Sequence, residues 1–128
     1  MRILITGGAG FIGSHLSERH LALGDEVFII DNLSTSVITN VQHMEGNSRF
    51  HCKIDDILNV EVMRRLVEEC DLIYHLAAAV GVEYILQNPL QTLMTNIRGT
   101  EIVLEQAARA KVERIVYCST ESILESPS

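Results

Sequence analysis

The stretch ITGGAGFIGSH, residues 5–15, holds glycines three residues apart between two apolar segments. It fits two spacings at once, Gly8-x-Gly10-x-x-Gly13 and Gly7-x-x-Gly10-x-x-Gly13. The segment before it has the length and composition of a buried strand, and the segment after it has the pattern of a helix. In that context the spacing predicts a tight turn that brings backbone N–H groups at a helix N-terminus close to a pyrophosphate. The structural alternative is a glycine-rich turn that binds nothing.

Short apolar runs alternate with helical patterns along the rest of the chain. The pattern predicts five strands, at residues 2–6, 26–30, 49–53, 71–76 and 113–119. It also predicts helices over 11–23, 59–69 and 89–110, with a short one over 37–44. Strands that alternate with helices form right-handed crossovers and a parallel sheet covered on both faces. The sequence therefore predicts one α/β domain, residues 1–128, of the Rossmann-type doubly wound class with about five strands.

Individual residues set the expected helix faces and ends. In the first helix Ile12, Leu16 and Leu23 are expected on or near one inward face, with Gly24 as the stop. Asn59 is expected to cap its helix. The inward residues of that helix are expected to be Val62, Leu66 and Val67.

Composition excludes several classes of function. A net charge of −7 argues against nucleic acid as a partner, because phosphate backbones attract basic surfaces. No apolar run reaches the roughly 18 residues of a membrane span, and no small-residue cleavage site follows the apolar N-terminus. Cys52, Cys70 and Cys118 lack the spacing of a metal site, so we expect no metal and reduced thiols in a cytoplasmic protein.

Asp31 ends the second predicted strand, 18 residues after Gly13. A dinucleotide fold places an acid there to accept hydrogen bonds from the adenosine ribose hydroxyls. The acid also repels a 2′-phosphate and no arginine follows nearby, so NAD is favoured over NADP. A turn residue is the structural alternative for Asp31, and a flavin stays open as the ligand. A P-loop is excluded, since no Gly-Lys-Ser/Thr follows the glycines.

Five segments then occur in order: TGGAGFIG, DNLST, YHLAAAVGVE, NPLQTLMTNIRGT and CSTES. With them the chain resembles the NAD-dependent sugar-nucleotide epimerase/dehydratase family of extended short-chain dehydrogenases, which includes isomerases and lyases. The resemblance covers essentially all 128 residues but only the N-terminal part of the family's usual length. It implies a truncated chain that carries the NAD-binding part without a C-terminal substrate domain.

The resemblance also assigns roles to residues. It implies that NAD is bound by the pyrophosphate loop (Gly7, Gly10, Phe11, Ile12 and Gly13) and by residues at the adenosine ribose and nearby phosphate (Asp31, Asn32, Ser34 and Thr35). It also implies contacts to adenine by Asp56 and Ile57, and a groove toward the nicotinamide ribose lined by Leu76, Ala77 and Ala78. Asn96 matches a buried asparagine beside the active site, for which a structural role is equally open. Thr120 matches the catalytic Ser/Thr that hydrogen-bonds the sugar hydroxyl being oxidised, and a loop hydroxyl is its alternative.

The sequence departs from the family in two ways. Ile123-Leu124-Glu125 replaces the usual Val-Tyr-Gly, and no Tyr-x-x-x-Lys pair is present to supply the family's base. We therefore expect no turnover of nucleotide sugars by the isolated chain. Three hypotheses stay open: the cofactor part of a longer enzyme, a stand-alone dinucleotide-binding or regulatory module, and a subunit completed by a partner chain.

The predicted helix over 89–110 carries apolar residues on more than one side. One stripe is expected to pack on the sheet, and a wider apolar arc is usually buried on a second side as well. In the resembled family the corresponding helix contributes to a dimer interface. We therefore expect a homodimer or a larger, concentration-dependent assembly.

Overall fold

The computed structural model describes residues 1–77, 87 and 89–117, and its centre is a parallel five-stranded sheet in the order β3-β2-β1-β4-β5. The strands are β1 (Arg2–Thr6), β2 (Glu26–Asp31), β3 (Phe50–Ile54), β4 (Leu72–His75) and β5 (Arg114–Tyr117). The predicted α/β Rossmann-type class is confirmed. The predicted end of the fifth strand, residues 118–119, lies outside the described residues.

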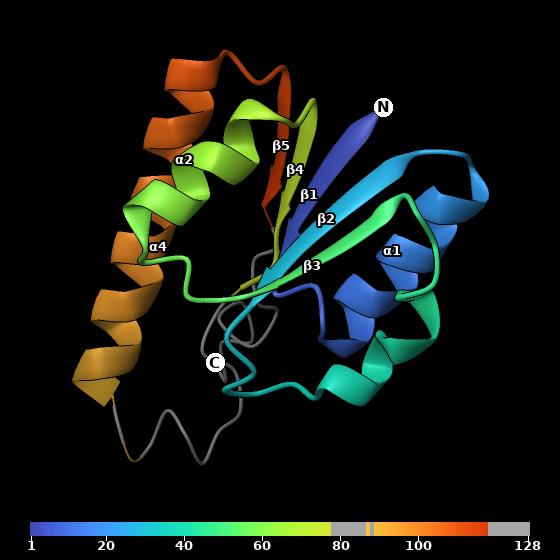
Figure 1. Cartoon of the computed structure of the whole chain (residues 1–128). Helices are drawn as coiled ribbons and strands as arrows, with labels where there is room; N and C mark the ends of the chain where they lie inside the picture. Colours follow the sequence, from blue (N-terminus) through green and yellow to red (C-terminus); the bar gives the residue numbers. More distant parts are fainter. Residues whose placement is uncertain (78–86, 88, 118–128) are drawn as a thin grey trace, which may run out of the picture.

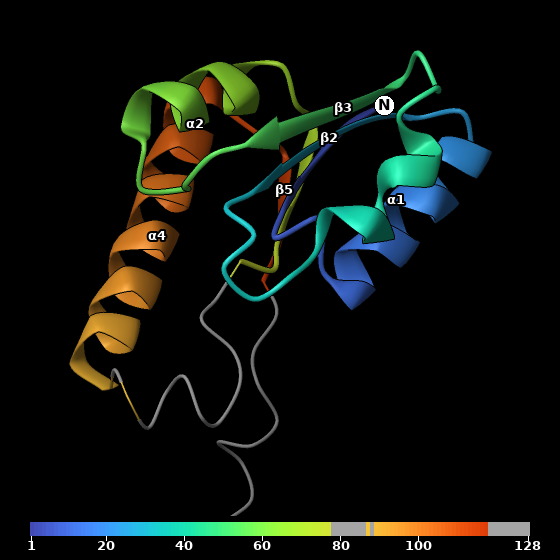
Figure 2. The same ribbon diagram turned by 60° about the horizontal axis from the view of Figure 1, so that its bottom comes forward.

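Helices cover both faces of this sheet. Helix α1 (Phe11–Ala22) lies on one face, and α2 (Val60–Glu68) and α4 (Pro89–Ala110) lie together on the other (Figure 1). From β1 the chain builds outward through β2 and β3, and it then returns to place β4 on the other side of β1. Figure 2 shows the same layers from below, where the carboxyl ends of the strands come forward. The switch in direction falls between β1 and β4, where open α/β sheets bind ligands.

Two hydrophobic clusters form the core, one on each face of the sheet. On the α1 face Ile3 and Ile5 pack with Val27 and Ile29, and all four are fully buried. On the other face the members include Leu4, Ile30, Met63, Ile73 and Ile102. Alternate residues of β1 and β2 thus serve opposite faces, as a sheet buried on both sides requires.

The inward face predicted for α1 is wrong at two of its three residues. Ile12 is 59% exposed and Leu23 is 60% exposed, whereas Leu16 packs against the core as expected. The buried face of the helix is instead made of small residues and one leucine: Gly13, Ser14, Ser17 and Leu21. The serine hydroxyls donate to carbonyl groups of the helix itself, so they are buried at low cost and let the helix approach the sheet closely.

Of the other local predictions, those for Gly24 and Asn59 are confirmed and the short helix over 37–44 is wrong. Gly24 has φ +89° and ends the α1 segment, as expected. The side chain of Asn59 accepts a hydrogen bond from the Val62 N–H at 3.3 Å, so the predicted cap of α2 is confirmed. The short helix predicted over 37–44 is instead two separate 3₁₀ turns, η1 (Ile38–Asn40) and η2 (Gln42–Met44).

The inward face of α2 also differs in detail from its prediction. Met63 and Val67 are buried, while Val62 and Leu66 are half-buried at the margin of the same cluster. This nine-residue helix lies beside α4 on the same face of the sheet, and it buries Met63, which the pattern missed.

Over residues 1–77 and 89–117, no helix is long and apolar enough to cross a membrane. The same ranges contain no group of three or more potential metal ligands. Cys52 and Cys70 are free thiols, and Cys118 lies outside the described residues. Burial raises the pKa of Cys70 to about 12.

Candidate functional site

The glycine turn after β1 joins three strands at their carboxyl ends. The Gly7 N–H donates to the Ile30 carbonyl of β2 at 2.8 Å, and Gly7 has φ +71°. A Cβ at Gly7 would lie 2.9 Å from the backbone nitrogen of Ala77, which follows β4. Only glycine fits where the backbone is left-handed and a neighbouring chain approaches so closely.

The start of α1 is packed directly on this turn. A Cβ at Gly13 would lie 2.7 Å from the carbonyl oxygen of Gly7 and 2.7 Å from Cα of Gly8. Gly10 occupies the N-cap without a side-chain hydrogen bond, and no acidic residue lies in the first turn. Phe11 and Ile12 form that first turn with exposed side chains. The helix therefore presents its N-terminal N–H groups beside the glycine turn, and such an arrangement can bind an anion.

Asp31 holds the turn in place. Its carboxylate is buried, and Oδ2 accepts the Ala9 N–H at 3.0 Å. Oδ1 accepts the Leu33 N–H at 2.7 Å and the Ser36 hydroxyl at 2.8 Å. A carboxylate offers about four acceptor positions, and these three bonds leave one on Oδ2. Asp31 thus combines a structural role in the turn, which the sequence left open as its alternative, with a free acceptor at the strand end.

The residues that follow Asp31 lie at the same edge of the sheet. The Asn32 side-chain oxygen accepts the Ser34 N–H at 3.0 Å, and its amide nitrogen donates to Asp56 Oδ2 at 3.4 Å. Asn32, Ser34 and Thr35 are exposed, and Asp56 is half-buried. The structure therefore brings Asn32 and Asp56 together beside Asp31.

Two expected contact residues lie differently. Ile57 is buried in the core, where its side chain faces Gly99 of α4 so closely that a Cβ at Gly99 would lie 2.4 Å from Ile57 Cδ1. Asn96 of α4 is half-buried rather than buried. Ala78 and Thr120 lie outside the described residues.

Three site residues were missed from the sequence. Asn40 of η1 donates its amide to the Ala9 carbonyl at 2.8 Å, so the Ala9 peptide is held on one side by Asn40 and on the other by Asp31. Thr6 and His75 end β1 and β4, and their side chains are hydrogen-bonded to each other at 2.7 Å. Polar residues at the carboxyl ends of two apolar strands were the available signal for Thr6 and His75, whereas nothing in the pattern marked Asn40.

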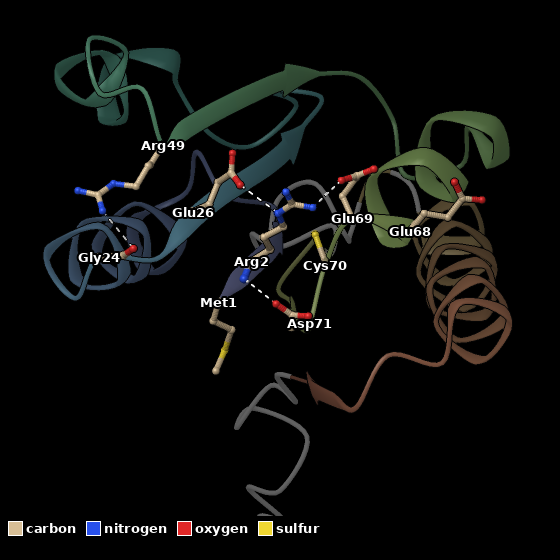
Figure 3. A pocket seen from close by; sticks show the side chains of 9 residues that line it. All are labelled: Met1, Arg2, Gly24, Glu26, Arg49, Glu68, Glu69, Cys70 and Asp71. Atoms are coloured by element: carbon tan, nitrogen blue, oxygen red, sulfur yellow. Dashed lines mark hydrogen bonds and ion pairs between the residues drawn. The ribbon is translucent and has the colours of Figure 1, made fainter.

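A depression lies at the opposite end of the sheet from the glycine turn. It has a volume of about 630 Å³, and charged residues near the starts of the strands, among them Arg2, Glu26 and Asp71, form most of its lining (Figure 3). Arg2 pairs there with Glu26 at 3.1 Å and with Glu69 at 2.8 Å. Arg2 is thus paired with two carboxylates of this depression, at the end of the sheet opposite to the glycine turn.

The comparisons with known proteins agree with this geometry. The family described as GDP-mannose 4,6 dehydratase matches residues 4–123. The chain belongs to this family. The resemblance to sugar-nucleotide epimerases and dehydratases is thereby confirmed.

The chain spans 29–40% of the length of the following similar proteins. UDP-glucuronic acid decarboxylase 1 of Danio rerio is 40% identical over 126 residues, which make up 98% of this chain and 29% of the relative. UDP-glucose 4-epimerase of Thermus thermophilus, solved in complex with NAD, is 36% identical with a TM-score of 0.82, covering 94% of this chain and 38% of that one. The UDP-glucose-4-epimerase of Stenotrophomonas maltophila, with bound NAD and formylated UDP-arabinopyranose, is 29% identical with a TM-score of 0.87, covering 100% and 40%.

Proposed function

We propose that this family member binds NAD across the carboxyl edge of its sheet, as the cofactor-binding part of a nucleotide-sugar epimerase, dehydratase or decarboxylase. The observation that carries the proposal is the glycine turn at the switch point, held against Asp31 at the end of the neighbouring strand. Support comes from relatives whose solved structures contain NAD at 29% and 36% identity. NAD supplies a hydride acceptor for oxidation of a sugar hydroxyl.

Each part of the cofactor has a counterpart in the described residues. The N–H groups of Phe11 and Ile12 would receive the pyrophosphate, because they begin α1 above the glycine turn. The free acceptor position on Asp31 would receive an adenosine ribose hydroxyl, with Asn32, Ser34 and Thr35 around it.

The remaining assignments rest on the family resemblance. Asp56 lies beside Asn32 and would contact adenine, while Ile57 would do so only through its backbone, since its side chain is in the core. Leu76, Ala77 and Ala78 would line the nicotinamide side, with Asn96 nearby on α4. Thr120 would hydrogen-bond the sugar hydroxyl. Residues 1–128 thus form one proposed NAD-binding domain.

Calorimetric titration with NAD and with NADP tests the proposal. We expect tighter binding of NAD, because the Asp31 carboxylate accepts from a ribose hydroxyl and repels a 2′-phosphate. Asp31→Ala should weaken NAD binding and reduce the difference in affinity between NAD and NADP. Asp25→Ala is the matched control, since it removes the same charge at the opposite end of the sheet. Equal affinities of the unmodified chain for the two cofactors would contradict the proposal.

We further propose that residues 1–128 alone do not turn over nucleotide sugars, because this sequence holds no Tyr-x-x-x-Lys pair. An assay of the purified chain with UDP-sugars and NAD is the test, and turnover that Thr120→Ala abolishes would show another base at work. NAD binding without turnover is also what a stand-alone regulatory module or a subunit completed by a partner would give. A Tyr-x-x-x-Lys pair encoded downstream in the same gene would indicate the cofactor part of a longer enzyme. The same pair on a partner chain would indicate a completed subunit, and its absence from both would favour the regulatory module.

Helix α4 is proposed as the surface where a second copy of the chain associates. Its inward face buries Thr92, Gly99, Ile102, Val103, Gln106 and Ala107. Its outward face exposes five large apolar side chains, Leu90, Leu93, Met94, Ile97 and Leu104, each at least 51% exposed. Two such stripes from identical helices are self-complementary in a two-fold dimer. Sedimentation over a concentration series is the test, and a strictly monomeric chain at high concentration would exclude it.

A further inference from the structure

A chain of hydrogen bonds links β1, β4 and α4 at the switch point of the sheet. Thr6 Oγ1 lies 2.7 Å from His75 Nδ1, and His75 Nε2 lies 3.1 Å from Thr100 Oγ1 of α4. Thr6 Oγ1 also accepts the Leu76 N–H and the Ala77 N–H, each at 3.1 Å. Side chains from β1, β4 and α4 thus meet at one imidazole.

The donors in this chain can be assigned by counting. A threonine hydroxyl offers one donor and two acceptor positions. Thr6 Oγ1 already accepts two backbone N–H groups, of which the Leu76 N–H is shared with the Thr6 carbonyl. Its own hydrogen therefore points to His75 Nδ1, since the reverse assignment would require a third acceptor position and leave the hydroxyl hydrogen unused. His75 is then the neutral tautomer that carries its proton on Nε2 and donates to Thr100.

The surroundings of His75 favour the neutral form. The ring is 4% exposed, and burial lowers the pKa of His75 to about 4. Among the described residues, polar groups near the ring are the hydroxyls of Thr6 of β1 and Thr100 of α4, and the ring of Tyr117 of β5 lies 5.7 Å away between centroids. The two threonine hydroxyls that are hydrogen-bonded to the ring carry no charge.

The hydroxyl of Thr6 acts directly on the glycine turn. It holds the Ala77 N–H, and this same nitrogen lies 2.9 Å from where a Cβ of Gly7 would be. The rotamer of Thr6 therefore sets how closely the end of β4 approaches the turn, and His75 fixes that rotamer by accepting the hydroxyl hydrogen.

We infer that His75 is a positioning residue which, through the Thr6 hydroxyl, holds the end of β4 against Gly7 in the geometry that the dinucleotide site requires. The inference rests on the proposed NAD site for its functional consequence. Its structural content, the Nε2-protonated imidazole and the Thr6–Ala77 bond, stands apart from that proposal.

Two pairs of variants test the inference. His75→Leu removes the acceptor, while His75→Asn keeps a polar oxygen near Nδ1. Thr6→Val removes the hydroxyl with little change in shape, while Thr6→Ser restores it. We expect His75→Leu and Thr6→Val to weaken NAD binding about three- to tenfold, the range of one hydrogen bond. His75→Asn and Thr6→Ser should recover most of the affinity. Thr100→Val, which leaves the Thr6–His75 bond intact, is the control and should change affinity less than twofold.

Nitrogen-15 NMR of the His75 imidazole reports which ring nitrogen carries the proton, and a purely space-filling role of His75 would not require either tautomer. We expect a non-protonated Nδ1 and a protonated Nε2 at neutral pH in the native chain, and faster hydrogen exchange of the Ala77 amide in Thr6→Val. A proton on Nδ1, or unchanged Ala77 exchange, would overturn the inference even if NAD binds. A native chain that shows the expected tautomer and exchange but binds no NAD would overturn the proposed function instead. Equal losses of affinity in His75→Asn and His75→Leu, with both chains folded by circular dichroism, would also exclude positioning through Nδ1.

Discussion

Substitution of Gly13 by alanine probes the closest backbone contact in the proposed site. The added Cβ would lie 2.7 Å from the Gly7 oxygen and 2.7 Å from Gly8 Cα, whereas carbon atoms in favourable contact lie about 3.5–4.0 Å apart. Both neighbouring atoms belong to the backbone, so no side chain can rotate to relieve the overlap. The start of α1 and the glycine turn must therefore move apart by several tenths of an ångström or more.

The cost in stability follows from two opposing effects. Overpacking of a close contact costs about 1–3 kcal/mol, and we take the upper half because backbone must shift. Alanine in a helix recovers up to about 1 kcal/mol relative to glycine. A net loss of about 1–2 kcal/mol lowers the melting temperature of a chain of this length by roughly 4–8 °C.

Thermal unfolding followed by circular dichroism measures this loss, with Gly46→Ala as the matched control. No atom lies within 4 Å of a Cβ at Gly46, so alanine there should leave stability unchanged or raise it slightly. NAD titration at a temperature where both chains are folded should show a loss of affinity for Gly13→Ala alone. Gly13→Ala that melts within about 1 °C of the control would refute the packing described for the turn.

Three further perturbations test other parts of the structure. Asn59→Ala removes the cap that accepts the Val62 N–H and should cost about 1 kcal/mol in urea unfolding, and an unchanged midpoint would contradict the capping role. Thr92→Val should keep or raise the melting temperature, because the buried Thr92 hydroxyl has no hydrogen-bond partner among the described residues, whereas a clear decrease would reveal one. The hydrogen bond from the His20 side chain is the main cause that lowers the pKa of Asp25 below its ordinary 3.8. The ionised carboxylate therefore stabilises the fold above that pH, and this stabilisation is lost as the pH falls through the lowered pKa of the folded state. Asp25→Asn should therefore flatten the acid side of the stability curve, and an identical acid profile would contradict the assignment.

The sequence predicted the features of the site that depend on local backbone chemistry. The glycine turn and the acid at the end of β2 follow from spacing that a tight turn and a strand end impose on nearby residues. The cap at Asn59 and the stop at Gly24 are local in the same way.

Features that depend on distant contacts were not predictable. The buried face of α1 consists of Gly13, Ser14, Ser17 and Leu21, because the sheet beneath it requires a close approach, whereas a search for apolar periodicity selects Ile12 and Leu23. Asn40 reaches the Ala9 carbonyl across 31 residues of sequence, and no pattern near either residue indicates that bond.

The described bonds explain how the turn can be formed before any ligand arrives. The Ala9 peptide is held at its N–H by Asp31 and at its carbonyl by Asn40, and Gly7 is bonded to Ile30 of β2. The end of β4 is held by Thr6, so both sides of the turn are fixed by protein groups alone. A ligand that meets such a turn does not have to order the loop, and little of its binding free energy is lost to conformational entropy. In the proposed NAD complex Asp31 would couple stability and recognition, because the carboxylate that orders the turn would also accept a hydrogen bond from a ribose hydroxyl. Removal of Asp31 should accordingly lower both the affinity for NAD and the melting temperature, whereas substitution of the exposed Ser34 or Thr35 should lower the affinity alone.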